Sequence, residues 1–265
     1  MSYSFPLFRF LGTRTLALGA YMGQLIFLMG ETFRAFFSTN VRWRLAFQQT
    51  LEVGIRSQLV VIITGAFTGA VFAAQTYFQF QKLSMGTAVG PVVAVSMFRE
   101  LGPVLTGLMV AGRVGAAMSA EIGTMKVTEQ LDALRSMGVH PVDYLVVPRA
   151  MAMIISMPIL VAECIRIGIF TGQLVAVKGM GVSEAWYVNY MLKFTAMRDL
   201  EISLVKGCVF GILIVFVACF EGLQAKEGAV GVGQAATEAV VRGSLFILIA
   251  NFFLTMLLNT IFPAG

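Results

Sequence analysis

The chain has 265 residues, of which 58% are hydrophobic and only 12% are charged, and its formal net charge is +5. Its mean hydropathy of +0.83 indicates more apolar surface than one soluble core of this size could bury, which excludes an ordinary soluble domain. The basic residues flank apolar segments, so the charge indicates membrane anchoring rather than nucleic-acid binding. We therefore expect an all-α integral membrane protein.

The N-terminal region, residues 1–50, contains an apolar stretch that is short for a membrane span. Only sixteen residues, "TLALGAYMGQLIFLMG", separate Arg14 from Glu31, which corresponds to about 24 Å of helix. This length favours an amphipathic helix in the membrane interface, with its basic ends among the headgroups, over the alternative of a sixth span. No cleavable signal is expected, because Arg9 and Arg14 lie within the apolar stretch.

Residues 51–265 form the predicted transmembrane domain, in which we expect about five spanning helices. The candidate spans are 59–80, 101–112, 145–162, 202–220 and 244–262. Most approach the ~20 residues that cross a bilayer. The second is predicted to be a broken or tilted helix, because prolines and charges interrupt its apolar sequence: Pro91, Arg99, Glu100, Pro103 and Arg113.

The distribution of basic residues predicts the orientation of these spans. Five spans place the N-terminal region and the connections 121–149 and 221–243 on one side of the membrane. That side carries eleven Lys and Arg residues, whereas the other carries four: Lys82, Lys178, Lys193 and Arg198. The positive-inside rule therefore predicts a cytoplasmic N-terminus.

The polar stretch 126–138 is predicted to be a short amphipathic helix on the cytoplasmic side. Its apolar positions recur at helical spacing: Val127, Leu131, Leu134 and Met137. Thr128 is the expected N-cap, and Gly138 followed by Pro141 supplies the end. So short a helix must pack on something, and the spacing leaves open whether this is the protein's own surface or a partner.

A series of motifs runs through residues 98–149 in one order: "RELGP", "AGRVGAA", "AEIGTM", "TEQLDAL", "MGV.P" and "PR". This series resembles the signature region of the MlaE/YrbE family of ABC-transporter permeases, and looser similarity extends over the whole chain. The resemblance implies that 126–138 is a coupling helix that docks in a cleft of a cytoplasmic ATPase. The residues implied in this coupling are Glu129, Gln130, Leu131, Leu134 and Met137.

The resemblance also implies a function and a set of partners. Such permeases are homodimers in the inner membrane of Gram-negative bacteria, and they move phospholipid between the inner and outer membranes to maintain outer-membrane asymmetry. The implied partners are the ATPase, a periplasmic MCE-domain protein and, in many members, a small STAS-like cytoplasmic subunit. Because the chain has no G-x-x-x-x-G-K-[ST] motif, ATP and Mg are expected in the ATPase, and no cofactor in this chain.

Charged and polar residues within the spans are the candidates for substrate binding. An ionisable side chain there costs ~2.5–3.5 kcal/mol on insertion scales unless it is paired or wet. Arg99 and Glu100 therefore indicate either an interfacial salt bridge or the charged rim of a water-accessible lipid cavity, in which Glu100 would orient Arg99. A mixed polar and aromatic lining also suits such a cavity. The candidate residues are Phe72, Gln75, Thr76, Tyr77, Phe78, Met97, Arg99, Glu100, Lys206 and Asn251.

Two other function classes fit the sequence less well. A lipid-modifying intramembrane enzyme would need clustered His, Asp or Cys, but His140 is the only histidine, so no catalytic or metal-binding residue is expected. An ion-coupled secondary transporter would have inverted repeats, which an odd number of spans fits poorly. Two glycine motifs are also interpreted: "GAFTG" at 65–69 indicates intrachain packing or a dimer seam, and "GAVGVG" at 228–233 a cytoplasmic turn.

Overall fold

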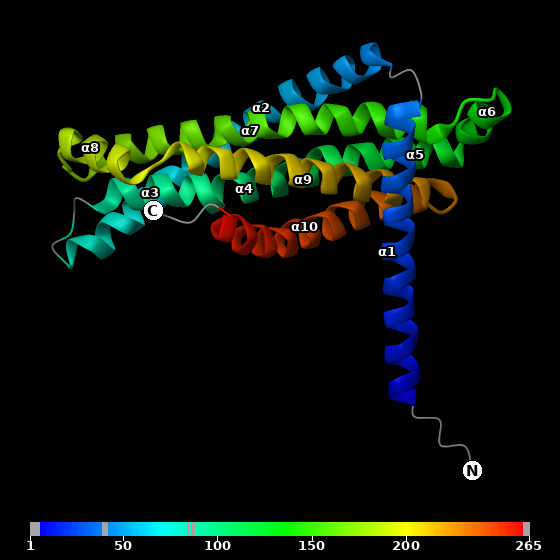
Figure 1. Cartoon of the computed structure of the whole chain (residues 1–265), viewed down its shortest axis with the longest axis horizontal. Helices are drawn as coiled ribbons and strands as arrows, with labels where there is room; N and C mark the ends of the chain where they lie inside the picture. The colour runs from blue at the N-terminus through cyan, green and yellow to red at the C-terminus, as the bar shows by residue number, and fades with distance from the viewer. Residues whose placement is uncertain (1–5, 39–41, 84, 86–87, 262–265) are drawn as a thin grey trace.

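The computed structural model describes residues 6–38, 42–83, 85 and 88–261, and within these ranges the chain is helical apart from short connections (Figure 1). Six helical runs of the described chain are long and apolar enough to cross a membrane. The predicted fold class is therefore confirmed, and the protein is a multi-pass membrane protein. α7 and α9 form its buried centre, whereas α2 and α10 expose most of their apolar side chains.

The helix α1 (Pro6–Ser38) is twice as long as the apolar stretch predicted for the interface. Figure 1 shows α1 running across the other helices, near the end of the bundle where α6 lies, instead of alongside them. The Tyr21 hydroxyl fixes it there by donating a 2.7 Å hydrogen bond to Glu221 Oε1, which also pairs with Arg242. Its candidate span, Gly12–Phe37, has a mean hydropathy of only 1.2. This crosswise direction is the one expected of an interfacial helix.

The other spans extend beyond the apolar runs that predicted them. They are α2 (Trp43–Gln81), the run Val89–Val127, the run Val142–Gly179, α9 (Met197–Leu223) and α10 (Gly228–Ile261). The run Val142–Gly179 consists of η4 (Val142–Val146), α7 (Val147–Leu174) and η5 (Val175–Gly179). The short helix α8 (Glu184–Phe194) follows it. The predicted turn at 228–233 is wrong, because these residues form the first turns of α10. Phe262, the predicted last residue of the fifth span, lies outside the described residues.

The second span is one continuous helical run with two π-helical turns, not a broken helix. Its segments are α3 (Val89–Ser96), η2 (Met97–Leu101), α4 (Gly102–Val110), η3 (Ala111–Gly115) and α5 (Ala116–Val127). The two π-helical turns contain the three charged residues that interrupt the apolar sequence, Arg99, Glu100 and Arg113. Turns of this kind are rare within α-helices and occur frequently at functional sites.

The "GAFTG" motif packs α2 against α7 of the same chain. A Cβ atom on Gly65 would lie 2.7 Å from the carbonyl oxygen of Cys164, and one on Gly69 would overlap the carbonyl group of Gly168. Only glycine allows the two backbones to approach so closely. Of the two interpretations of this motif, intrachain packing is therefore confirmed.

Candidate functional site

Charged and polar side chains from η2, α9 and α10 meet within the bundle of spans. We call this group the buried network, and it consists of Arg99, Glu100, Asp199, Lys206, Asn251 and Thr255. Arg99 and Glu100 lie on η2. Asp199 and Lys206 lie on α9, and Asn251 and Thr255 lie on α10. Four of the predicted substrate-binding residues are thus brought together.

Lys206 is the centre of the buried network. Its side chain is fully buried, and its Nζ donates to Glu100 Oε1 at 3.0 Å, to Thr255 Oγ1 at 2.8 Å and to the carbonyl oxygen of Arg99 at 2.6 Å. An ammonium has three donors, so each of them has an acceptor. A buried charge is tolerated when it is paired and hydrogen-bonded in this way.

Arg99 and Glu100 each pair with a different residue of α9. Arg99 Nε donates to Asp199 Oδ1 at 2.7 Å, whereas Glu100 accepts from Lys206 and, at 2.8 Å, from Asn251 Nδ2. Neighbours in a helix point in different directions, so the predicted orientation of Arg99 by Glu100 is wrong. Asp199 performs that role instead.

Arg99 lies at the accessible edge of the network. Its side chain is 33% exposed, whereas that of Asp199 is 2% exposed. Within the part of the chain that the structure describes, only Nε of the Arg99 guanidinium is engaged by another group. The two terminal nitrogens can therefore present a planar fork, which matches phosphate oxygens bidentately.

Two members of the network, Asp199 and Thr255, are absent from the residues that the sequence predicts. Asp199 is the third residue of α9 and accepts the backbone N–H of Ala196 at 3.0 Å, so it also caps that helix. An acidic residue in the first turn of an apolar helix is a signal that could have drawn attention to it. Thr255 carries no such signal, because threonine is common within membrane-spanning helices.

The predicted lining residues of α2 do not join the network. Gln75 and Phe78 are exposed on the surface of this chain, whereas Thr76 is buried. Phe72 and Tyr77 pack against an apolar cluster that contains Met97.

Met97 is fully buried in this cluster, where the absence of a side chain on Gly168 makes room for it. Its assignment as a cavity-lining residue is therefore wrong for the single chain.

The predicted coupling helix 126–138 is divided by a turn. Helix α5 continues to Val127, and α6 comprises only Gln130–Ser136. Thr128 ends α5, its Oγ1 donating to the carbonyl oxygen of Thr124 at 2.9 Å, so its assignment as the N-cap is wrong. Glu129 occupies that position with φ of 58°, a left-handed conformation uncommon outside glycine that permits the sharp turn.

The apolar face of α6 is partly buried against its own chain and partly exposed. Leu131 is 4% exposed and Leu134 is half-buried, whereas Met137 is 69% exposed. Glu129 and Gln130 are also exposed. Figure 1 shows α6 projecting beyond the end of the bundle. Leu131 therefore anchors α6 to its own chain, and its exposed neighbours remain for a partner.

Comparison with known proteins gives consistent matches over most of the chain. Residues 46–257 match the family model described as Permease MlaE. The chain is 45% identical over 214 residues to a probable ABC transporter permease protein of Rickettsia typhi, covering 81% of this chain and 83% of the relative. It is 38% identical over 219 residues to the intermembrane phospholipid transport system permease protein MlaE of Haemophilus influenzae, covering 82% and 83%.

A chloroplast protein is also similar. The chain is 34% identical over 228 residues to Protein TRIGALACTOSYLDIACYLGLYCEROL 1 of Arabidopsis thaliana, covering 86% of this chain and 65% of that protein. Together with the spans and the helix α6, these matches show that the chain belongs to the MlaE family of ABC-transporter permeases and is a transport subunit rather than an enzyme.

Proposed function

We propose that this permease moves phospholipid between the inner and outer membranes of a Gram-negative bacterium and thereby maintains outer-membrane lipid asymmetry. The observation that carries the proposal is the position of Arg99, a guanidinium at the accessible edge of a network within the spans. In a partly dry cavity, a charge-assisted contact with phosphate is stronger than in water. The name of the Haemophilus influenzae relative, a phospholipid transport permease, supports the same substrate class.

The proposed assembly contains two copies of this chain in the inner membrane, with the N-terminus and α6 in the cytoplasm. A cytoplasmic ATPase binds ATP and Mg, a periplasmic MCE-domain protein exchanges lipid with the permease, and a STAS-like subunit joins the ATPase. The exposed side chains of Gln75 and Phe78, with Tyr77, line a lipid cavity between the two copies together with Arg99 and Glu100.

The helical run Val89–Val127 offers a route by which the ATPase acts on the lipid. Leu131 holds α6 against its own chain, so a displacement of α6 by the ATPase is passed to α5. α5 is continuous through η3 and α4 with η2, which carries Arg99 and Glu100. Asp199 competes with phosphate for the Arg99 guanidinium, which limits the grip of Arg99 and favours release of the lipid.

The proposal is tested by reconstituting the permease with its ATPase in proteoliposomes and measuring ATP-dependent transfer of a fluorescent phospholipid. Arg99→Gln leaves the buried Asp199 carboxylate without its cation, so we expect some loss of stability, and at equal amounts of folded protein it should reduce transfer about tenfold, since a hydrogen bond to a charged group contributes ~1.5–3 kcal/mol. Arg99→Lys should restore transfer only in part, because it keeps the charge without the fork. Transfer that needs neither ATPase nor ATP would contradict the proposal and favour an ion-coupled transporter.

The role of α6 is tested separately by association with the ATPase. Met137→Asp should weaken co-purification of the ATPase and leave the unfolding midpoint of the permease unchanged, because Met137 is exposed. Gln234→Asp places the same charge on an exposed position of α10 and serves as the control. Leu131→Asp should instead destabilise the permease, since it buries a charge. Unchanged co-purification with Met137→Asp would contradict the role of α6.

A further inference from the structure

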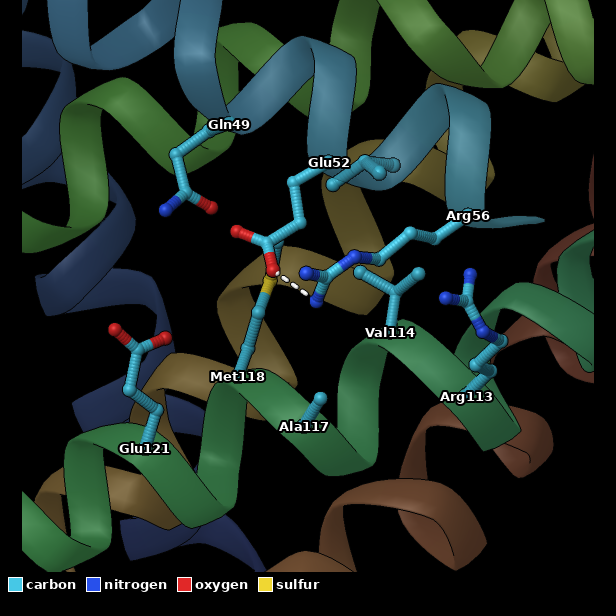
Figure 2. Close-up of a pocket in the computed structure, with 9 residues that line it drawn as sticks. Gln49, Glu52, Arg56, Arg113, Val114, Ala117, Met118 and Glu121 are labelled. Atoms are coloured by element: carbon cyan, nitrogen blue, oxygen red, sulfur yellow. Dashed lines mark hydrogen bonds and ion pairs between the residues drawn. The ribbon is translucent and has the colours of Figure 1, made fainter.

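A second group of charged residues lies between α2 and the η3–α5 part of the second span. There the structure forms a pocket of about 160 Å³ (Figure 2), which we call the α2–α5 pocket. Its lining residues are Gln49, Glu52, Val53, Arg56, Arg113, Val114, Ala117, Met118 and Glu121. None of them belongs to the buried network, and η3 and α5 follow η2 along the second span in the direction of α6.

The two arginines of the pocket are weakly engaged. Arg113 donates a 2.8 Å hydrogen bond to Ser57 Oγ, and no carboxylate of the described residues lies within ion-pair distance of it. Arg56 pairs with Glu52 at 2.5 Å, but these side chains are 67% and 51% exposed. An exposed ion pair contributes little to stability and is readily exchanged for another partner. Both guanidinium groups are thus able to turn toward a ligand.

The carboxylates lie on the other side of the pocket from Arg113. Figure 2 shows Glu52 and Arg56 reaching over the pocket, with Arg113 at one edge and Glu121 at the opposite edge. An inorganic phosphate would meet Glu52 and Glu121 as well as the arginines, whereas a ligand with separate negative and positive groups would match both sides, its ammonium joining carboxylates that Arg56 and Arg149 neutralise only in part. The charge pattern therefore indicates a zwitterion.

Exposed apolar side chains continue along α2 and the neighbouring helix beyond the pocket. Leu59 and Ile63 follow Glu52 and Arg56 at helical spacing on α2 and are 68% and 49% exposed. Met109, one turn before Arg113 on the neighbouring helix, is 36% exposed. The volume of the pocket is below the ~300 Å³ typical of a site for a whole small molecule. A charged pocket followed by an apolar surface fits an amphiphile whose headgroup alone enters the pocket.

A buried arginine next to the pocket lacks one hydrogen-bond partner. Arg149 is 3% exposed and pairs with Glu121 at 2.7 Å, yet its Nε has no acceptor among the described residues. It lines a larger cavity of about 560 Å³ that shares Gln49 and Glu121 with the α2–α5 pocket. A buried donor without an acceptor is rare in folded proteins and indicates a missing polar partner. This observation points to a ligand or an ordered water beside Glu121.

We infer that the α2–α5 pocket binds the headgroup of a phospholipid that carries both a phosphate and a primary ammonium. The phosphate is held by Arg56 and Arg113, and the ammonium by Glu52 and Glu121. This inference rests on the proposed phospholipid transport and adds a separate lipid site on the cytoplasmic side of the buried network. A lipid of the inner leaflet would occupy it with its acyl chains along Leu59 and Ile63.

The inference is tested with the full-length protein in mild detergent, by native mass spectrometry with added phosphatidylethanolamine. Arg113→Gln should weaken binding of this lipid about tenfold, the effect of losing one charged hydrogen-bonding group. Arg56→Gln should also weaken binding of the lipid. Because Arg56 is exposed, this variant should fold, and it therefore tests the site even if Arg113→Gln does not fold. Arg44→Gln makes the same change at an exposed position of α2 outside the pocket and should leave binding unchanged.

The headgroup is tested by comparing phosphatidylethanolamine with phosphatidylglycerol, which has no ammonium. Glu52→Gln should reduce the preference for phosphatidylethanolamine. Equal binding by Arg56→Gln, Arg113→Gln and Arg44→Gln would overturn the site. Competition by inorganic phosphate as strong as that by phosphoethanolamine would also overturn the site, because it would identify a free anion as the ligand. A disulfide between two copies of the Arg56→Cys variant would overturn it too, because it would show that a second copy covers the pocket.

The outcomes for the pocket and for the proposed function are distinguishable. If the wild-type protein binds no phospholipid, the proposed function fails together with the pocket. If it binds phospholipid and ATP-driven transfer depends on Arg99, but the pocket variants match Arg44→Gln, then only the pocket fails.

Discussion

The buried network and the α2–α5 pocket contain the same kinds of residue in two different environments. In the network, the side chains of Lys206 and Asp199 are at most 2% exposed and all their partners lie within the chain. In the pocket, the side chains of Glu52 and Arg56 are more than half exposed. Lys206 and Asp199 in the network have lost their hydration and depend on their partners, whereas Arg99 and Glu100 at its edge, 33% and 39% exposed, and the charges in the pocket remain partly hydrated. Burial therefore decides whether a charge near the membrane mainly holds the fold or remains available to a ligand.

The largest effect expected from this difference is that of Lys206→Met. The change leaves Glu100 in the network without its ammonium partner. Breaking a fully buried pair typically costs ~3–5 kcal/mol, and because Glu100 is 39% exposed and can be rehydrated, we expect the lower end of that range. The free energy of unfolding in detergent, measured by denaturant titration, checks the value. Lys193→Met on α8 is the control, because Lys193 is exposed.

A double variant sharpens the same prediction. Lys206→Met combined with Glu100→Gln removes both charges of the pair, so it should recover part of the lost stability. A Lys206→Met variant as stable as Lys193→Met would show that water reaches the network and would remove the contrast with the pocket.

A smaller loss of stability is expected for Asp199→Asn. The change removes the charge that pairs with Arg99 but keeps an oxygen able to accept the N–H of Ala196, so we expect ~1–3 kcal/mol. Glu201→Gln on the exposed face of α9 is the control. Freed from Asp199, Arg99 should bind phosphate more tightly, so dissociation of phospholipid should slow. Faster dissociation would contradict the role of Asp199 as a competitor for the guanidinium.

The sequence predicts the spans well because their signal is local. A run of about 20 apolar residues needs the bilayer wherever it occurs. The ends of the spans are less predictable, because α2 and α10 continue as helices through polar residues beyond the apolar runs. Nothing in the local sequence requires a helix to stop where the hydrocarbon stops.

The partners of the charged residues could not be predicted, because they depend on the folded arrangement. Arg99 and Asp199 are separated by 100 positions in the sequence, and Glu100 reaches Asn251 across 151 positions. The turn before α6 could not be predicted either, because glutamate is not a residue type that indicates a left-handed conformation such as that of Glu129. The apolar spacing of α6 correctly indicated a buried face, but only the fold shows that Leu131 covers its own chain.

The smallest loss of stability is expected for Glu52→Gln in the α2–α5 pocket, in contrast to Lys206→Met in the buried network. Glu52 and Arg56 form an exposed pair one helical turn apart, and such pairs contribute only ~0.3–0.5 kcal/mol. The free energy of unfolding in detergent should therefore change by no more than about 0.5 kcal/mol, and raised salt should reduce even this difference. A loss of more than about 1 kcal/mol would mean that lipid or a second chain covers the pair in the assembled protein, so that its charges behave like those of the buried network.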